Sequence, residues 1–511
     1  MKKRSTIKLY QLVAFIVIVF TISSCKDQFN EQAGELITPD QHYKSMKDAE
    51  ISLYGAFIPL QNAIPKLIMI DGLRSDLMDV RSNADGYLKA INDQSFTVDN
   101  PIIDPSDYYK VILNVNEVLA NIDKVTAVDR NFDSITVYFY KTALIGLRSW
   151  SYFNLVKLYG EAAWIGDNMT SLPANPHLPI LSKDAMIDTL IHQIKPYIYD
   201  PTVKKEYVEL RLKPFMNTKA LLGELYLEKN DYANAIIYLK MACESYGNDA
   251  KILKVDKAYA KDAWKSIFVD SESGDTENLS VVVFNSNENQ FNPLVRWMLN
   301  TDMFMVKPSQ ALVDSFKTQI PALGTIGDLY RGQGVTYDTT ATGEPYISKY
   351  AINRAQPYST DIIISRAADL HLMLAEALNR SGDEKTAMIL LNAGFAGESK
   401  KPAPYAKWSG NLGIRGRASL KAKVVPDSIN HVLLTGIART EYVEDLIMNE
   451  RALELAFEGK RWFDLVRVAK RRGTPEYLAN KVAGKFADPV QAGAIRTTLM
   501  DESKWYLPYV K

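Results

Sequence analysis

Three carboxylates near the C-terminus have the spacing of a single helical face. Glu450, Glu454 and Glu458 recur every four residues, so on an α-helix their side chains form a ladder along one side. Paired carboxylates are the usual machinery of glycoside hydrolysis. The alternative is structural, because a row of like charges is unfavourable unless cations pair with it. We favour bidentate pairing with arginines of adjoining helices. The candidate partners are Arg148, Arg366 and Arg439.

No other residue pattern in the chain indicates catalysis. The five histidines form neither an H-E-x-x-H motif nor a close pair with metal-ligand spacing, and we expect His371 to be packed inside a helix. Phosphate-binding loops, dinucleotide-binding loops and the G-x-S-x-G elbow are all absent. Cys243 lies among apolar helical residues and is expected to be buried. We therefore predict a protein that is not an enzyme and that binds no cofactor or metal.

Composition and charge narrow the range of partners. Hydrophobic residues make up 47% of the 511 residues, which is enough for a sizeable core. Lys plus Arg and Asp plus Glu number 60 each, and residues 1–24 contain four basic and no acidic side chains. Without that segment the chain is slightly acidic, so we exclude nucleic acid as a partner. Aromatic residues make up 10%, and those exposed on loops would suit stacking on flat ligand faces.

The N-terminus has the organisation of an export signal. A basic start is followed by an apolar stretch over 9–22 and by the small pair Ser23-Ser24 directly before Cys25. The apolar stretch is shorter than the roughly 20 residues that span a bilayer. The segment resembles a lipobox, which implies cleavage after residue 24 and acylation of Cys25, with 25–38 as a tether. The alternative is an ordinary signal peptide or anchor helix in which the cysteine is incidental.

Helical periodicity dominates the remainder, from 39 to 511. It fades over roughly 250–360, where 281–284 has the pattern of a short strand, and again over 395–435. Ser106 is the expected N-cap of one helix. The predicted helices are 106–124, 134–159, 183–199, 215–228, 231–246, 361–380, 383–393, 440–458 and 460–471. The sequence thus predicts one mainly α-helical domain, with a helical scaffold over about 39–250 and 361–511 and a loop-rich insertion over about 250–360.

Two helical hairpins repeat one another with the offsets of a tetratricopeptide motif. In the first, Gly223 and Ala235 are small residues twelve apart that let two helices cross closely, and Asn230-Asp231 form the turn. The second places Ala375, Ala387 and the Gly382-Asp383 turn at corresponding offsets. The long segments that separate the two copies are where a binding surface is expected.

The segment 439–467 resembles the C-terminal signature of the SusD/RagB family, in which an ER-x-x-EL-x-x-EG-x-R-x-x-DL-x-R run recurs. The matching residues are Glu450, Arg451, Glu454, Leu455, Glu458, Gly459, Arg461, Asp464, Leu465 and Arg467. Residues 366–377 and 148–160 are similar to two further family segments, although Ser149 stands where Ala is usual. The closing Trp-Tyr-Leu-Pro and the lipobox agree with the same family.

This resemblance implies a SusD-like fold and a lipoprotein of the outer membrane that faces the cell exterior. Family members act as a lid on a TonB-dependent transporter of the SusC type. They capture oligosaccharides, or peptides in RagB-like branches, and deliver them without hydrolysing them. The ladder of carboxylates then belongs to a structural motif.

Ligand contacts are expected in two regions outside the family match, 71–87 and 289–300, and at one isolated tryptophan. Carboxylates, amides and guanidinium groups near an aromatic ring suit a sugar, since the polar groups bind hydroxyls while the ring covers the apolar sugar face. The alternative for each is a helix cap, an ion pair or a core position. The candidate residues are Arg74, Asp76, Arg81, Asn83, Tyr87, Phe291, Trp297 and Trp408.

Four functions remain open at this point. Capture of a glycan predicts exposed aromatic rings, whereas capture of a peptide predicts a deeper polar cleft. An enzyme with an unrecognised site would turn over substrate and lose activity in a Glu454→Gln variant. A structural surface lipoprotein would bind a transporter and no solute.

Overall fold

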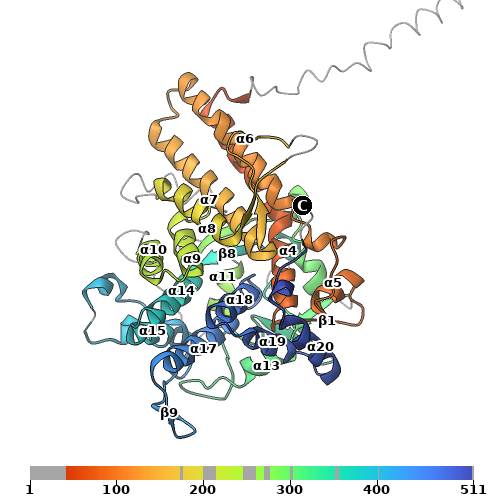
Figure 1. Ribbon diagram of the computed structural model, residues 1–511, viewed down its shortest axis with the longest axis vertical. Coiled ribbons are helices and arrows are strands. Elements are labelled where there is room, and N and C mark those ends of the chain that lie inside the picture. Colours follow the sequence, from red (N-terminus) through yellow and green to blue (C-terminus); the bar gives the residue numbers. More distant parts are fainter. Residues whose placement is uncertain are drawn as a thin grey trace, which may run out of the picture.

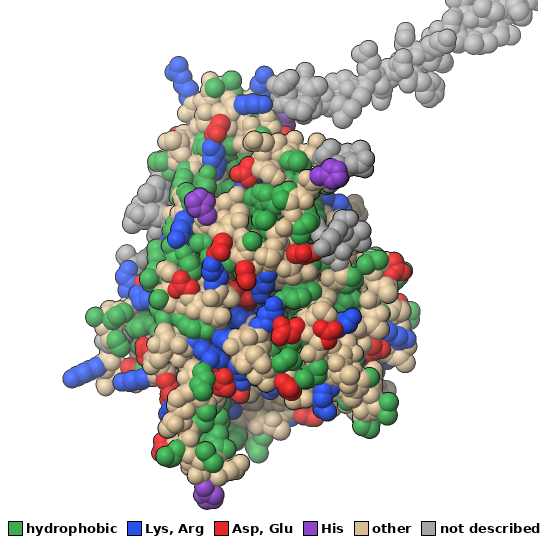
Figure 2. All heavy atoms as spheres, in the orientation of Figure 1, with side chains coloured by type: hydrophobic (Ala, Val, Ile, Leu, Met, Phe, Trp, Pro, Cys, Tyr) green, Lys and Arg blue, Asp and Glu red, His purple; other side chains and the backbone are tan. Residues whose placement is uncertain are grey.

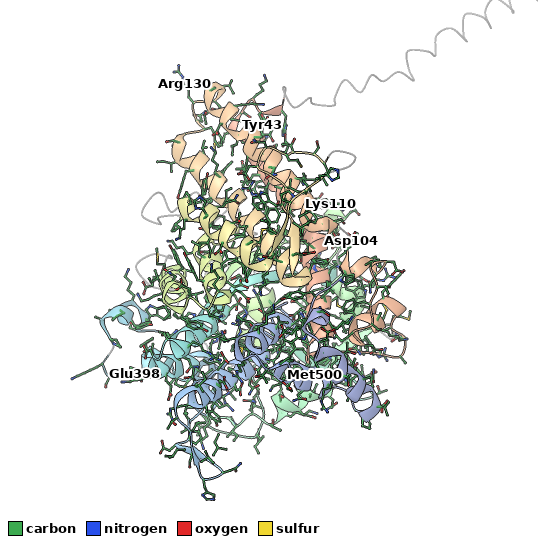
Figure 3. All side chains as sticks on the ribbon, viewed as in Figure 1. Tyr43, Asp104, Lys110, Arg130, Glu398 and Met500 are labelled. Atoms are coloured by element: carbon green, nitrogen blue, oxygen red, sulfur yellow. The ribbon has the colours of Figure 1, made fainter. Side chains whose placement is uncertain are left out.

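The computed structural model describes residues 42–172, 177–198, 215–244, 261–269, 277–299, 303–350, 356–400 and 402–508. The export signal, Cys25 and the tether lie outside these residues. The molecule is elongated and mainly helical, as expected (Figure 1). Tyr43 and Arg130 lie at one end of the long axis, whereas Glu398 and Met500 lie towards the other end (Figure 3).

The N-terminal third forms a layer of long helices. Its helices are α3 (Met46–Phe57), α4 (Leu60–Arg74), α5 (Gly86–Asn92), α6 (Ser106–Val128), α7 (Ser134–Tyr159) and α8 (Lys183–Ile194). Helix α7 is buried along nearly its whole length and ends at Gly160, whose positive φ closes the helix. Pro105 occupies the N-cap position of α6 and makes no side-chain cap, so the prediction that Ser106 is the N-cap was wrong by one residue. The stretch 46–74 is apolar enough to cross a membrane, but two thirds of its most apolar window is buried in protein.

The two predicted hairpins are present. They are α9 (Thr218–Glu228) with α10 (Tyr232–Glu244), and α14 (Ala367–Arg380) with α15 (Glu384–Leu391). A Cβ atom on Gly223 would lie 2.5 Å from Cγ of Leu239, which confirms the close crossing in the first hairpin. Asn230 and Gly382 have positive φ at the two turns.

The prediction that a helix begins at 361 was wrong. Residues Ile362–Arg366 form strand β8, which pairs antiparallel with β4 (Asn278–Val282). The predicted strand at 281–284 is therefore present in part, shifted towards the N-terminus. No Gly or Pro separates β8 from α14, so the sequence pattern alone did not distinguish strand from helix here.

The C-terminal third is again helical. It contains α16 (Ile414–Arg417), α17 (Gly436–Glu454), α18 (Arg461–Arg472), α19 (Pro475–Ala483) and α20 (Pro489–Leu499). Glu458 therefore lies beyond the end of α17, and the predicted helix 440–458 ends four residues early. Trp505 is fully buried and fixes the C-terminal segment in the core.

Short elements make up the described part of the insertion and the remaining loops. The helices are α11 (Lys261–Val269), α12 (Leu294–Met298) and α13 (Gln310–Lys317). The strand pairs besides β4–β8 are β1 (Met78–Val80) with β5 (Val306–Pro308), β2 (Glu161–Ala163) with β3 (Ile180–Ser182), β6 (Tyr337–Thr339) with β7 (Pro345–Ile347), and β9 (Ser428–Ile429) with β10 (Val432–Leu433). Every sheet in the described residues has two strands, so helices form the scaffold.

Candidate functional site

The ladder of carboxylates is buried and paired. Arg366 donates to Glu454 from Nη1 at 2.7 Å and to Glu458 from Nε and Nη2 at 2.8 and 2.9 Å. Arg331 contacts both Glu450 and Glu454 at 2.8 Å. All five side chains are at most 7% exposed, so the cluster has little contact with solvent.

Of the three arginines proposed as partners, Arg366 is confirmed and the other two were wrong. Arg148 contacts Asp167 at 3.0 Å, and Arg439 contacts Glu384 at 2.7 Å. The partners that sequence reasoning missed lie in the insertion and around α16, distant in sequence from the ladder. They are Arg331, Lys349, Arg415 and Arg417.

The electrostatics of this cluster favour a structural role. Burial raises the pKa of the Glu454 carboxyl, but the three guanidinium groups around it outweigh burial and hold that pKa below its ordinary value. A general acid needs the opposite shift, towards neutral pH. A permanently ionised carboxylate that is saturated with arginine hydrogen bonds is suited to holding elements together.

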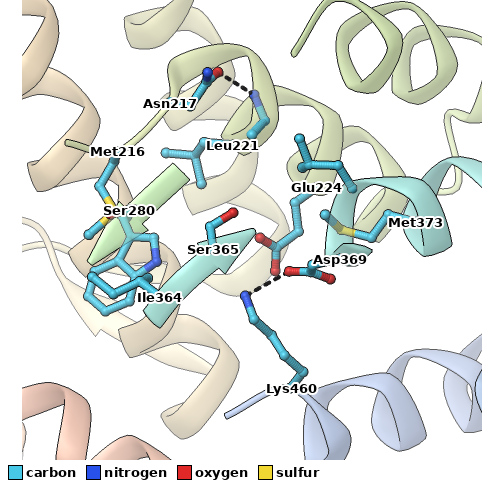
Figure 4. Close-up of a pocket in the computed structure, with 13 residues that line it drawn as sticks. Met216, Asn217, Leu221, Glu224, Ser280, Ile364, Ser365, Asp369, Met373 and Lys460 are labelled. Carbon is cyan, nitrogen blue, oxygen red and sulfur yellow. Dashed lines mark hydrogen bonds and ion pairs between the residues drawn. The ribbon is translucent and has the colours of Figure 1, made fainter. Parts of the chain in front are cut away.

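A small cavity lies between α7, α9, β8 and α14 (Figure 4). Glu224, Asp369 and Lys460 project towards it, and Lys460 pairs with Asp369 at 2.9 Å. Its volume is about 30 Å³. Cavities that bind small organic ligands measure roughly 300–1,000 Å³, so this one has room for water and not for a sugar.

Arg74 and Asp76 have structural partners. Arg74 is fully buried and donates to the carbonyls of Lys504 and Trp505 at 2.7 and 3.0 Å, and burial lowers its pKa to about 9. The Arg461 guanidinium donates two hydrogen bonds, of 2.7 and 2.8 Å, to the Asp76 carboxylate. Neither side chain is available to a ligand, because each connects the end of α4 to a segment near the C-terminus.

Arg81, Asn83 and Tyr87 lie nearer the surface. Arg81 pairs with both carboxylate oxygens of Glu344 and stacks over the Phe304 ring at 4.0 Å. Asn83 donates to the Phe304 carbonyl at 3.2 Å, and Tyr87 is 46% exposed. Arg81 and Asn83 are therefore bonded to groups within the protein, whereas Tyr87 presents an exposed aromatic ring.

The structure brings the two candidate regions together through Met305. Its N–H donates to the Trp297 carbonyl and its own carbonyl accepts from the Arg81 N–H, both at 2.9 Å. Trp297 itself is half-buried against the core. Trp408 is different, since it is completely buried, donates from Nε1 to Glu244 at 2.8 Å and offers no face to a ligand.

Phe291 forms an exposed pair with Tyr358, which the sequence did not single out. The rings are 51% and 43% exposed, their centroids are 6.0 Å apart and their planes cross at 89°. We call these two residues the aromatic corner. The only sequence signal for Tyr358 was its place in an irregular stretch, between Pro357 and Ser359.

Hydrogen bonds beneath the surface fix the two loops that carry the aromatic corner. Asn292 is fully buried, and it donates from its backbone to the Tyr358 carbonyl at 2.8 Å and from its side chain to the Thr360 carbonyl at 2.7 Å. The backbone N–H of Ser286 donates to Ser359 Oγ at 3.0 Å. These hydrogen bonds hold the loop that follows β4 beside the loop that precedes β8, with the Phe291 and Tyr358 rings exposed to solvent.

Polar side chains accompany the aromatic corner. Positions 287–290 are all exposed, and Asn289 adopts a left-handed conformation that turns the loop. The exposed polar residues are Asn287, Glu288, Asn289 and Gln290. Amides and a carboxylate beside open rings provide both donors and acceptors at a solvent-facing surface.

Residues 328–511 match the model of the SusD family. This part of the chain is therefore similar to the SusD family. The resemblance read from 439–467 is confirmed, and the buried ladder lies within the matched segment.

Over most of its length the chain has the same fold as solved SusD-like structures. A SusD superfamily protein from Bacteroides vulgatus is 18% identical, with a TM-score of 0.66 over 89% of this chain and 93% of that one. A laminarin-binding SusD-like protein is also 18% identical, with a TM-score of 0.57 over 88% and 95%. SusD-like protein P2 of Formosa agariphila is 21% identical over 89% of this chain and 90% of its own length. The predicted SusD-like fold is therefore confirmed.

Proposed function

We propose that this SusD-like chain is a surface lipoprotein that captures oligosaccharides and delivers them to a TonB-dependent transporter of the SusC type in the outer membrane. The observation that supports capture most directly is the aromatic corner. Two open rings on loops that a buried asparagine fixes provide apolar faces for sugar rings, and the neighbouring amides provide partners for hydroxyls.

The proposed ligand is a neutral or weakly charged glycan. Among the described residues at the aromatic corner, Glu288 is the exposed acid and Arg296 the nearest exposed base along the chain. One solved structure with the same fold is of a protein named as laminarin-binding, and another from Bacteroides vulgatus is named a SusD-like carbohydrate-binding protein. Both names agree with a glycan as the cargo.

The proposal includes no catalytic step. Delivery requires that the lipoprotein bind weakly enough to release its cargo, and a row of fully paired carboxylates supplies no proton donor near neutral pH. Anchoring through Cys25 and the transporter partner are parts of the proposal that follow from the family resemblance.

Calorimetric titration of the soluble form, which starts after Cys25, with a panel of neutral oligosaccharides tests the proposal. Binding of a saccharide that weakens in Phe291→Ala and in Tyr358→Ala supports it. Binding of peptides alone would replace the glycan with a peptide cargo.

A further inference from the structure

The end of the molecule at which the described chain begins carries a surface that the proposed ligand site does not use. Val128 and Ile135 flank the loop that joins α6 to α7, and their side chains are 60% and 41% exposed. Four basic side chains at the same end are exposed as well. We call these six residues the helical tip, and its basic members are Lys44, Lys47, Lys124 and Arg130.

A hydrogen bond holds the beginning of the described chain against the loop between α6 and α7. The Met46 N–H donates to Oδ2 of Asp129 at 2.9 Å, so Lys44 and Lys47 lie beside that loop. Figure 3 places Arg130 at this end of the long axis, and Figure 2 shows basic side chains that project there. Segments from two distant parts of the sequence therefore contribute to one surface.

The carboxylates near the helical tip are engaged within the protein. Asp129 and Asp133 each accept a hydrogen bond from a backbone N–H that follows them, at 2.9 and 2.8 Å. Asp48 completes the capping box of α3, and Asp123 pairs with Lys141 at 2.8 Å. Within the described part of the chain, the four basic side chains of the helical tip form no ion pair. Their charges are therefore available to an external anion.

The tether predicted after Cys25 leads to the helical tip. Residues 26–41 connect Cys25 to the described chain and reach at most about 55 Å. Acyl groups on Cys25 would hold this end of the molecule within that distance of the lipid. The β9–β10 hairpin lies at the opposite end of the long axis (Figure 1).

We propose that the helical tip rests on the anionic headgroups of the membrane that holds the anchor. Aliphatic side chains next to Lys and Arg suit this boundary, because the basic groups stay at the phosphates while apolar groups face the acyl chains. The contact would direct the long axis away from the membrane and keep the opposite end clear of lipid. The inference rests on the proposed function for the anchor at Cys25.

Fluorescence quenching tests the contact on the full lipoprotein, reconstituted in vesicles of phosphatidylcholine with or without phosphatidylglycerol. A fluorophore is attached through Val128→Cys, and lipids with a nitroxide on the headgroup act as quencher. Val490→Cys is the control, because Val490 is 78% exposed on α20, towards the other end. The native Cys243 is buried and stays unlabelled. We expect quenching at position 128 that phosphatidylglycerol strengthens at least about fivefold, and none at position 490.

Charge reversal tests the part that the basic side chains play. The double variant Lys124→Glu, Arg130→Glu should reduce quenching at position 128 at least about fivefold. Lys385→Glu, Lys400→Glu reverses two exposed lysines near the opposite end and should leave the quenching unchanged. Because Lys124 and Arg130 are exposed, the first variant should also fold and bind oligosaccharide as the parent chain does.

Three outcomes overturn the inference. Equal quenching at both positions would mean that the body lies flat, no quenching at position 128 would mean that the tip stands clear of the lipid, and quenching that phosphatidylglycerol does not change would exclude the charge match. The mass of the chain shows separately whether Cys25 is acylated. Without acyl groups the proposed anchor is wrong, and sedimentation of the soluble form with the anionic vesicles then decides: binding supports the contact, and its absence overturns it.

Discussion

The Arg366 guanidinium holds the Glu458 carboxylate through two hydrogen bonds of 2.8 and 2.9 Å, across 92 residues of sequence. Arg366 ends strand β8, which follows the loop that carries Tyr358, whereas Glu458 follows α17, and all three residues lie in the segment 328–511 that matches the SusD family. This pair therefore links the family signature to one of the loops that form the aromatic corner.

Removal of one carboxylate from the buried cluster should be costly. Glu454→Gln removes a buried counter-charge that three arginines share, so we expect the free energy of unfolding to fall by about 3–5 kcal/mol. Glu476→Gln, at an exposed position, should change it by less than about 0.5 kcal/mol. Urea unfolding of both variants measures the difference. Equal stability of the two variants would show that the cluster is not structural.

Acid should destabilise the protein over a defined range. Glu376 and Asp369 are buried, which raises the pKa of each carboxyl, but neighbouring arginine and lysine groups hold both pKa values below their ordinary range. A carboxylate with a lowered pKa in the folded state contributes stability above its unfolded pKa of about 4 and loses it as pH falls further. Stability followed by circular dichroism should decline steeply below about pH 4. A protein equally stable at pH 3 and pH 7 would contradict this.

His371 should add a shallower loss of stability at higher pH. Burial lowers its pKa to about 4 from the ordinary 6.5, while Nδ1 donates to the Ala367 carbonyl. Between pH 6.5 and 4 the His371 ring therefore binds a proton in the unfolded chain but not in the folded chain. The free energy of unfolding decreases as the pH is lowered across that interval. His371→Leu should flatten the slope there, even though it loses the hydrogen bond. An unchanged slope in urea titrations at pH 7.5 and 5 would assign the effect to other groups.

The close crossing of α9 and α10 can be tested with glycine substitutions. Gly223→Ala places a Cβ 2.5 Å from Cγ of Leu239, and we expect a loss of about 1–3 kcal/mol. Gly55→Ala is the matched control, because Gly55 is also helical and a Cβ atom on it would meet nothing within 4 Å. That variant should be neutral or more stable by up to about 1 kcal/mol. Thermal unfolding that ranks the two variants in the opposite order would contradict a tight hairpin.

Local patterns predicted the scaffold well and the contacts poorly. The helices 134–159 and 218–228 follow from apolar spacing within one segment, and the hairpin turns follow from Asn230 and Gly382. The partners of the ladder do not follow from local spacing, because Arg331 lies 123 residues from Glu454. Which arginine reaches which carboxylate depends on how distant segments pack.

The candidate ligand-binding residues show the same difference between what local sequence predicts and what depends on packing. Phe291 has an exposed ring on a loop, and its contact with a ligand stays a prediction, whereas Trp408 was selected by the same reasoning and is buried against Phe395 and Tyr405. A single aromatic between polar neighbours has no periodicity that separates surface from core. Local sequence does not mark Tyr358, because its place beside Phe291 depends on the hydrogen bond that the Asn292 N–H donates to the Tyr358 carbonyl.

Calorimetric titration of the soluble chain with neutral oligosaccharides tests the central claim most directly. For a saccharide that binds the parent protein, the account predicts that Phe291→Ala and Tyr358→Ala each weaken affinity about tenfold, which is about 1.4 kcal/mol. Tyr54→Ala, which removes a 37% exposed ring on α3, should leave affinity unchanged. Saccharide affinity that is equal in all three variants, or binding of peptides with none of the saccharides, would contradict it.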